Sequence, residues 1–260
     1  MIKNLIFEIA GVVVDYDPQQ YLYRKFNDPE LEQLLYSAIF GSKEWELLYT
    51  GQITRALAER RMLEAAGDCR YEAQMVLDDW RELMTTRLDT VELITALRAA
   101  GYHIYYLTNL SEDVFDLFVH RRRFMQLFEG GIASFAVKTK KPDAAIFDLL
   151  LKQYNLIPEE SAFIDVDRDS IATAQALGLT AIPFKGAMDL QKMLAFLGLT
   201  VPAKLRHAPR VKTSFFRRRR RKKLVSKMSD LAEKPIREDP LSPVVSYDQE
   251  TEEEEDNSEI

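Results

Sequence analysis

Three side chains that can bind or react with a ligand stand where short apolar runs of this sequence end. Glu8 follows the run Leu5–Phe7, and Thr108 and Asp165 stand at the ends of two later runs. Short apolar runs bounded by turn residues are typical of buried strands. Ligands of open α/β sheets bind at the edge where the strands end. We therefore expect two carboxylates and a hydroxyl at one ligand-binding edge.

Helix and strand patterns alternate from residue 91 onward, and they predict the elements that position these side chains. This alternation is typical of an α/β fold with a doubly wound parallel sheet. The expected strands are Tyr102–Leu107, Ser161–Asp165 and Thr180–Phe184, and the expected helices are Ala144–Tyr154, Asp169–Leu177 and Met188–Leu197.

Residues 18–88 are rich in helix formers and predict an all-helical insert of about four helices. Apolar residues from Leu31 to Ile39 recur at helical spacing. Thr54 follows a turn and is expected to be the N-cap of the next helix. A further helix is expected at Tyr71–Met84.

Four stretches, in this order, resemble the motifs of the haloacid dehalogenase-like (HAD) hydrolases, most of which are Mg-dependent phosphatases. They are IFEIAGVVVDYDP, YYLTNL, KTKKPDAAIF and FIDVDRDSIATAQALG. The segment WELLYTGQITRALAERRM is similar to the small helical cap of the glucose-1-phosphate-phosphatase-like subgroup. The resemblance implies a HAD-like, Rossmannoid core at residues 1–17 and 86–202 and a helical cap insert at 18–85. Residues 203–260 follow as a C-terminal tail that the resemblance does not cover.

The resemblance also implies a chemistry. In the family, the first-motif Asp attacks phosphorus, a hydroxyl and a lysine hold the phosphoryl oxygens, and further carboxylates hold Mg²⁺. Here Thr108, Asn109 and Lys141 match the phosphate-holding positions.

The nucleophile and metal positions depart from the family pattern. Glu8 replaces the nucleophilic Asp, and a misplacement of about 1 Å can cost roughly 10²-fold in rate. Ala10 stands at the general-acid position, which commonly contributes roughly 10²–10⁴-fold, although one subgroup of the family also lacks this acid. Val166 stands at a Mg²⁺-ligand position and offers no oxygen. Asp165 and Asp169 are the acids left nearby.

Three hypotheses for function follow. The first is a catalytically impaired pseudophosphatase that binds a phosphorylated ligand or a protein partner, with Glu8 paired to Lys141. The second is an active phosphatase on a small phosphomonoester, with Glu8 as the nucleophile and Mg²⁺ held by Glu8, Asp165 and Asp169. The third hypothesis is binding of nucleic acid or an anionic surface through the C-terminal tail. The first hypothesis needs no cofactor.

The tail, residues 203–260, has few apolar residues and long charge blocks, which predict disorder apart from a short helix near Leu224–Leu231. Its basic cluster, Lys204–Lys223, includes Phe215 and Phe216 and can bind nucleic acid or an anionic membrane surface. The alternative is that the acidic stretch Glu252–Asp256 neutralises the cluster within the same chain.

Composition narrows the class of protein further. The single cysteine, Cys69, excludes an intrachain disulfide, and no apolar run is long enough to span a membrane. With no signal-peptide pattern at the N-terminus, we expect a cytoplasmic protein. His103 is expected to be packed within an apolar strand, and neither His103 nor His120 has metal-ligand spacing.

Overall fold

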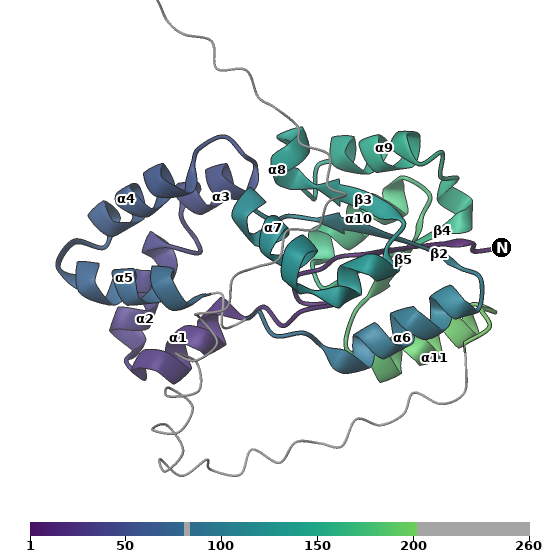
Figure 1. The fold of residues 1–260 in the computed structure, drawn as a ribbon, viewed down its shortest axis with the longest axis horizontal. Coiled ribbons are helices and arrows are strands. Elements are labelled where there is room, and N and C mark those ends of the chain that lie inside the picture. Colours follow the sequence, from purple (N-terminus) through teal and green to yellow (C-terminus); the bar gives the residue numbers. More distant parts are fainter. Residues whose placement is uncertain (81–83, 202–260) are drawn as a thin grey trace, which may run out of the picture. The chain divides into compact units, whose positions relative to one another are not determined.

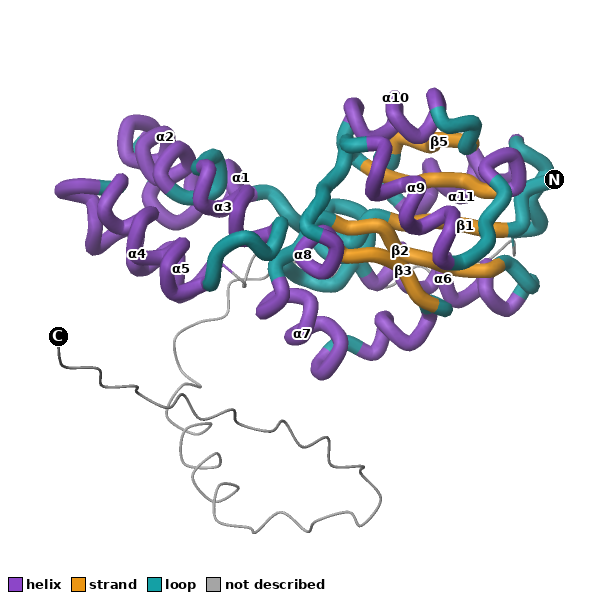
Figure 2. Tube along the Cα trace, turned by 90° about the horizontal axis from the view of Figure 1, so that it is seen from above, coloured by secondary structure: helices purple, strands orange, loops and turns teal. Residues whose placement is uncertain are grey.

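The computed structural model describes residues 1–80 and 84–201, all within one compact unit. A five-stranded sheet in the order β3-β2-β1-β4-β5 forms its centre, and every neighbouring pair is parallel. Figure 2 shows these strands side by side. The predicted α/β fold with a parallel sheet is therefore confirmed. The strands are β1 (Asn4–Phe7), β2 (His103–Thr108), β3 (Gly130–Ala133), β4 (Ser161–Asp165) and β5 (Thr180–Pro183).

The register of the central strands explains why the candidate side chains meet. Phe7 of β1 pairs with Tyr106 of β2 and with Ile164 of β4. Glu8 follows directly, and its amide donates a hydrogen bond to the Ile164 carbonyl at 2.9 Å. Because parallel strands end at the same edge, Glu8, the end of β2 and the end of β4 come together there.

Helices cover both faces of the sheet, as a doubly wound fold requires. Leu5 and Phe7 point to one face, where α6 (Leu88–Ala99), α7 (Glu112–Arg121) and α11 (Ala187–Phe196) pack. Ile6 points to the other, where α9 (Ala144–Gln153) and α10 (Arg168–Ala176) pack. Figure 1 shows α6 and α11 on one side of the sheet and α9 on the other. The alternation of side chains along β1 thus divides the core into two layers.

In the described part of the chain between β1 and α6 there are five α-helices, where the sequence predicted about four. The extra boundary separates α1 from α2, since Asn27 adopts a left-handed conformation with φ of 52° and Pro29 starts the next helix. Thr54 is the N-cap of α4, as predicted. The five helices are α1 (Pro18–Phe26), α2 (Pro29–Ala38), α3 (Lys43–Tyr49), α4 (Arg55–Ala65) and α5 (Arg70–Asp79).

The helix expected at Tyr71–Met84 is shorter than predicted, because α5 ends at Asp79. Short elements complete the described chain: α8 (Ser134–Val137) and the 3-10 turns Gly67–Cys69, Arg123–Leu127 and Pro158–Glu160. None of the described helices combines the length and apolar composition that crossing a membrane requires. The expectations for residues 203–260, including the helix near Leu224–Leu231, lie outside the described residues.

The prediction that His103 is packed within an apolar strand is wrong. His103 is the first residue of β2, and its side chain is 55% exposed. Its Nδ1 lies 3.0 Å from both carboxylate oxygens of Glu129. A position at the start of a strand keeps a side chain outside the layers of the core, which the apolar run alone could not reveal.

Candidate functional site

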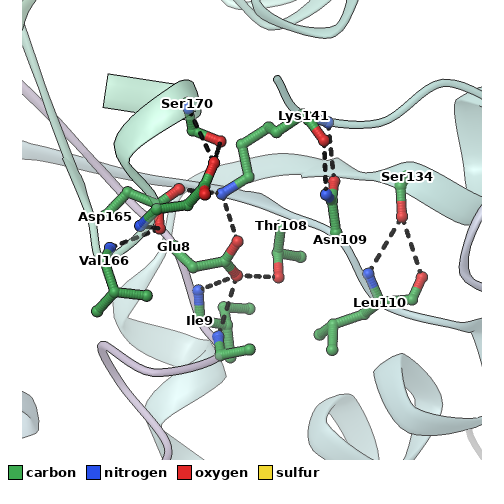
Figure 3. Close-up of polar contacts among 12 residues, drawn as sticks. Glu8, Ile9, Thr108, Asn109, Leu110, Ser134, Lys141, Asp165, Val166 and Ser170 are labelled. Atoms are coloured by element: carbon green, nitrogen blue, oxygen red, sulfur yellow. Dashed lines mark hydrogen bonds and ion pairs between the residues drawn. The ribbon is translucent and has the colours of Figure 1, made fainter. Parts of the chain in front are cut away.

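Four predicted side chains converge at the carboxyl edge of the sheet (Figure 3). Glu8 follows β1, Thr108 ends β2 and Asp165 ends β4. Lys141 reaches them from the loop that precedes α9. All four residues are buried. Side chains separated by as many as 157 positions in the sequence therefore form one polar cluster inside the protein.

Lys141 stands between the two carboxylates. Its Nζ donates one hydrogen bond to Glu8 Oε2 and another to Asp165 Oδ2. The ion pair of Glu8 with Lys141 that the first hypothesis includes is thus present. The second partner, Asp165, was not predicted, because the motif pattern assigned that residue only to a metal.

The remaining carboxylate oxygens also have donors. Glu8 Oε1 accepts from the Ile9 amide at 2.6 Å, the Ala10 amide at 3.0 Å and the Thr108 hydroxyl. Asp165 Oδ1 accepts from the amides of the next two residues, at 2.6 and 3.1 Å. All four carboxylate oxygens therefore accept hydrogen bonds within the protein.

Burial and charge act together on this cluster. Burial raises the pKa of the Glu8 carboxyl above its ordinary value, the Lys141 ammonium opposes the rise, and the Asp165 carboxylate adds to it. Burial by itself would lower the pKa of the Lys141 ammonium, but the two carboxylates outweigh burial and raise that pKa. The ammonium consequently stays protonated at neutral pH.

Asn109 positions the backbone of Lys141. Its Nδ2 donates to the Lys141 carbonyl at 3.0 Å, and its Oδ1 accepts from the Lys141 amide at 2.9 Å. Ser134, which the sequence did not single out, accepts from the Leu110 amide at 3.1 Å and donates to the Tyr49 carbonyl. A serine directly after β3 matches no motif, so only the fold could reveal this link between the sheet edge and α3.

The residues at and near the family's metal positions do not form a common metal site in this structure. Val166 is 51% exposed and lines the pocket beside Asp165. Asp167 is the N-cap of α10 and accepts from the amide and the hydroxyl of Ser170 at 2.8 and 2.6 Å. Asp169 is exposed in the first turn of α10 and does not line the pocket.

These residues do not fit the magnesium site that the family pattern implies. Within residues 1–80 and 84–201, no three His, Cys, Asp or Glu side chains form a group that can hold a metal ion. One carboxylate oxygen of Glu8 and one of Asp165 accept a hydrogen bond from Lys141, and the Val166 side chain has no oxygen atom. Mg²⁺ keeps several waters and is usually held by one or two carboxylates, and here both carboxylates are hydrogen-bonded to the Lys141 ammonium. The cluster is arranged around an ammonium instead.

A pocket of about 220 Å³ adjoins the cluster, and most of its wall is apolar. The rings of Trp45 and Trp80 meet edge to face at a centroid distance of 4.9 Å. Sequence motifs did not predict this wall, since most of its aromatic side chains come from the helical insert. The apolar and aromatic lining consists of Ala10, Tyr16, Trp45, Leu48, Tyr49, Trp80, Met84, Leu110, Val114 and Val166.

The fold is that of an α/β protein with a parallel sheet and a helical insert after its first strand. Residues 18–183 match the haloacid dehalogenase-like hydrolase family. The chain belongs to this family, as its motifs predicted. The match begins after Glu8 and Ala10, so it does not include the segment where the nucleophile position lies.

Curated relatives include phosphatases. A D-ribitol-5-phosphate phosphatase from Bacteroides thetaiotaomicron is 25% identical over 76% of this chain and 99% of its own. A sesquiterpene phosphatase from Aspergillus oryzae is 22% identical over 69% of this chain and 88% of its own. A drimenol cyclase from Aspergillus calidoustus is 26% identical over 75% of this chain, which spans only 36% of the cyclase.

Solved structures show the same fold. A predicted HAD-like hydrolase from Porphyromonas gingivalis superposes with a TM-score of 0.60 at 21% identity, over 77% of this chain and 100% of its own. A HAD family enzyme from Bacteroides thetaiotaomicron, in complex with magnesium and inorganic phosphate, superposes with a TM-score of 0.56 at 21% identity. That likeness covers 71% of this chain and 95% of the enzyme.

Proposed function

We propose that this HAD-family chain binds a ligand in its pocket without hydrolysing phosphomonoesters. The observation that carries the proposal is the position of Lys141, whose ammonium joins Glu8 to Asp165. A nucleophilic carboxylate has to present a free oxygen to phosphorus, and a metal needs carboxylate oxygens of its own. Here the lysine takes one oxygen of each carboxylate.

The pocket wall supports a ligand with an apolar body. Ligand sites are mostly apolar with a few placed polar groups, which is the composition seen here. One of the relatives is named a sesquiterpene phosphatase. That name describes the relative, and it supports an isoprenoid-like body for the ligand of this chain.

The first experiment measures Mg²⁺-dependent hydrolysis of p-nitrophenyl phosphate by the full chain. We expect the wild type to stay at the background rate. The double variant Glu8→Asp/Val166→Asp restores the two family carboxylates, and we expect it to gain activity. Glu8→Asp/Val166→Asn is the matched control, since it has the same shape but lacks the new charge. Strong Mg²⁺-dependent turnover by the wild type would overturn the proposal.

The alternative function is an active phosphatase that uses Glu8 as its nucleophile. The phosphatase relatives favour it, as does the convergence of Glu8, Thr108 and Lys141 at one point. The residues present do not form the family's magnesium site, so this alternative requires a different arrangement of Lys141 from the one seen. Trapping a phosphorylated Glu8 by rapid acid quench and mass spectrometry would establish it.

A further inference from the structure

We infer that the pocket selects an uncharged alcohol or carbonyl compound with a compact apolar body, and discriminates against phosphate esters. The inference rests on the proposed function and names its ligand class. It arises from three features of the described residues: the charge balance of the Lys141 cluster, the hydrogen-bond donors that remain at the pocket, and the apolar wall.

The charge balance disfavours an anion. One ammonium, that of Lys141, faces two carboxylates, so with both ionised the cluster carries a net charge of −1. Protonation of Glu8 would only bring this charge to zero. A phosphate ester brings further negative charge to within a few ångströms of these carboxylates, where charges interact strongly because water is scarce. An uncharged head group avoids this repulsion.

Donors for an uncharged oxygen remain. Trp80 is 1% exposed and lines the pocket, and its indole N–H has no acceptor among the described residues. A lysine ammonium has three donors, and Lys141 gives two of them to the carboxylates. A buried donor without an acceptor is unfavourable. A ligand hydroxyl or carbonyl oxygen supplies such an acceptor without adding charge.

The wall limits the size and polarity of the rest of the ligand. A volume of about 220 Å³ is small compared with the roughly 300–1,000 Å³ typical of ligand pockets. Trp45, Leu48 and Tyr49 approach from α3, and Val114 from α7. A small, branched or cyclic hydrocarbon body fills such a space and removes apolar surface from water.

The test compares geraniol with geranyl monophosphate, which have the same hydrocarbon body and differ only in the phosphate. The two tryptophans of the chain, Trp45 and Trp80, both line the pocket, so intrinsic fluorescence reports directly on its occupancy. We expect saturable binding of geraniol by the full chain and an affinity for the ester at least about tenfold weaker, equivalent to about 1.4 kcal/mol.

Three variants separate the effect of the cluster's charge from the effect of the pocket's volume. Glu8→Gln removes the excess negative charge, so the preference for geraniol over the ester, measured as the ratio of the two dissociation constants, should fall by at least about threefold, or about 0.65 kcal/mol. Ala10→Leu should fill the pocket and abolish binding of both compounds. Ala195→Leu makes the same change at an exposed position of α11 and should bind like the wild type.

Each other outcome has a defined meaning. If the ester binds as tightly as geraniol or more tightly, without release of phosphate, the ligand class is wrong and the proposed function stands. Release of phosphate from the ester would contradict the proposed function itself. Failure of both compounds to change the fluorescence would also overturn the inference.

Discussion

Asn109 and Lys141 exchange two hydrogen bonds, at 3.0 and 2.9 Å, between the Asn109 side-chain amide and the backbone of Lys141. Asn109 directly follows β2, and Lys141 lies in the loop before α9. The pair fixes the backbone from which the Lys141 side chain extends to Glu8 and Asp165. Because the Asn109 side chain binds both the backbone N–H and the carbonyl of Lys141, it positions the buried Lys141 ammonium.

Replacing Asn109 should loosen the loop that carries Lys141. Asn109→Ala removes both hydrogen bonds and should lower the free energy of unfolding by about 2 kcal/mol, because a partly buried amide and carbonyl lose their partners. Urea denaturation followed by circular dichroism measures the change. Asn109→Asp keeps the acceptor for the Lys141 amide but sets a carboxylate oxygen against the Lys141 carbonyl, which also accepts, so it should not restore the lost stability. A stability of Asn109→Ala equal to that of the wild type would contradict this account.

Removing the ammonium should be far more costly. Lys141→Met leaves two buried carboxylates facing each other without a cation, and breaking a buried ion pair from one side costs about 3–5 kcal/mol. The triple variant Glu8→Gln/Lys141→Met/Asp165→Asn removes all three charges and should recover much of that stability. Urea midpoints of the two proteins decide the matter. A single variant as stable as the wild type would mean that the pairing in the cluster contributes little.

Titration of Glu8 should contribute to the pH dependence of the free energy of unfolding. Its pKa is raised in the folded protein above the ordinary value of 4.5. A raised pKa of an acid means that its contribution to stability is fully present below pH 4.5 and is lost as the pH rises through the folded pKa. The free energy of unfolding of the wild type, minus that of Glu8→Gln, should therefore fall from pH 4 toward neutrality. A difference that rises over this range would contradict the assigned direction.

Gly51 should tolerate no side chain, because a Cβ there would lie 2.5 Å from the Phe135 carbonyl oxygen. Gly51→Ala should lower the free energy of unfolding by at least about 2 kcal/mol, because the added Cβ overpacks this site and the backbone φ of 65° is unfavourable for alanine. Gly67→Ala is the control, with a φ of 55° and open space around the added Cβ. It should cost only about 1 kcal/mol. Similar thermal midpoints for the two variants would show that the approach of Gly51 to α8 is not tight.

The C-terminal tail supports a separate proposal. Residues 204–223 contain eleven Lys and Arg residues and no Asp or Glu. We propose that this segment binds anionic lipid surfaces and that the acidic residues after 229 weaken the binding. Co-sedimentation with phosphatidylserine vesicles should increase when residues 233–260 are deleted and be lost when residues 204–260 are deleted. The same chains tested on single-stranded RNA reveal whether nucleic acid is the preferred surface instead. Unchanged sedimentation in both deletions would exclude the proposal.

Much of the fold follows from local patterns. The apolar runs before Glu8 and Thr108 are strands, and the helices of the sheet region begin and end within one or two residues of their expected positions. These elements obey capping residues and apolar spacing, which act over a few residues. The number of helices in the insert was underestimated, because the αL conformation of Asn27 and the helix start at Pro29 lie between two continuous helical patterns.

The sequence by itself determined which chemical groups stand at the sheet edge: Glu8, Thr108, Lys141 and Asp165, with Val166 at a metal position. Only the tertiary structure decided what they do to one another. The bridge of Lys141 to both carboxylates depends on strand register and on a loop held by Asn109. The apolar wall depends on α3 and the end of α5 meeting that edge. Such contacts join residues far apart in the chain, and no local pattern encodes a distance between them.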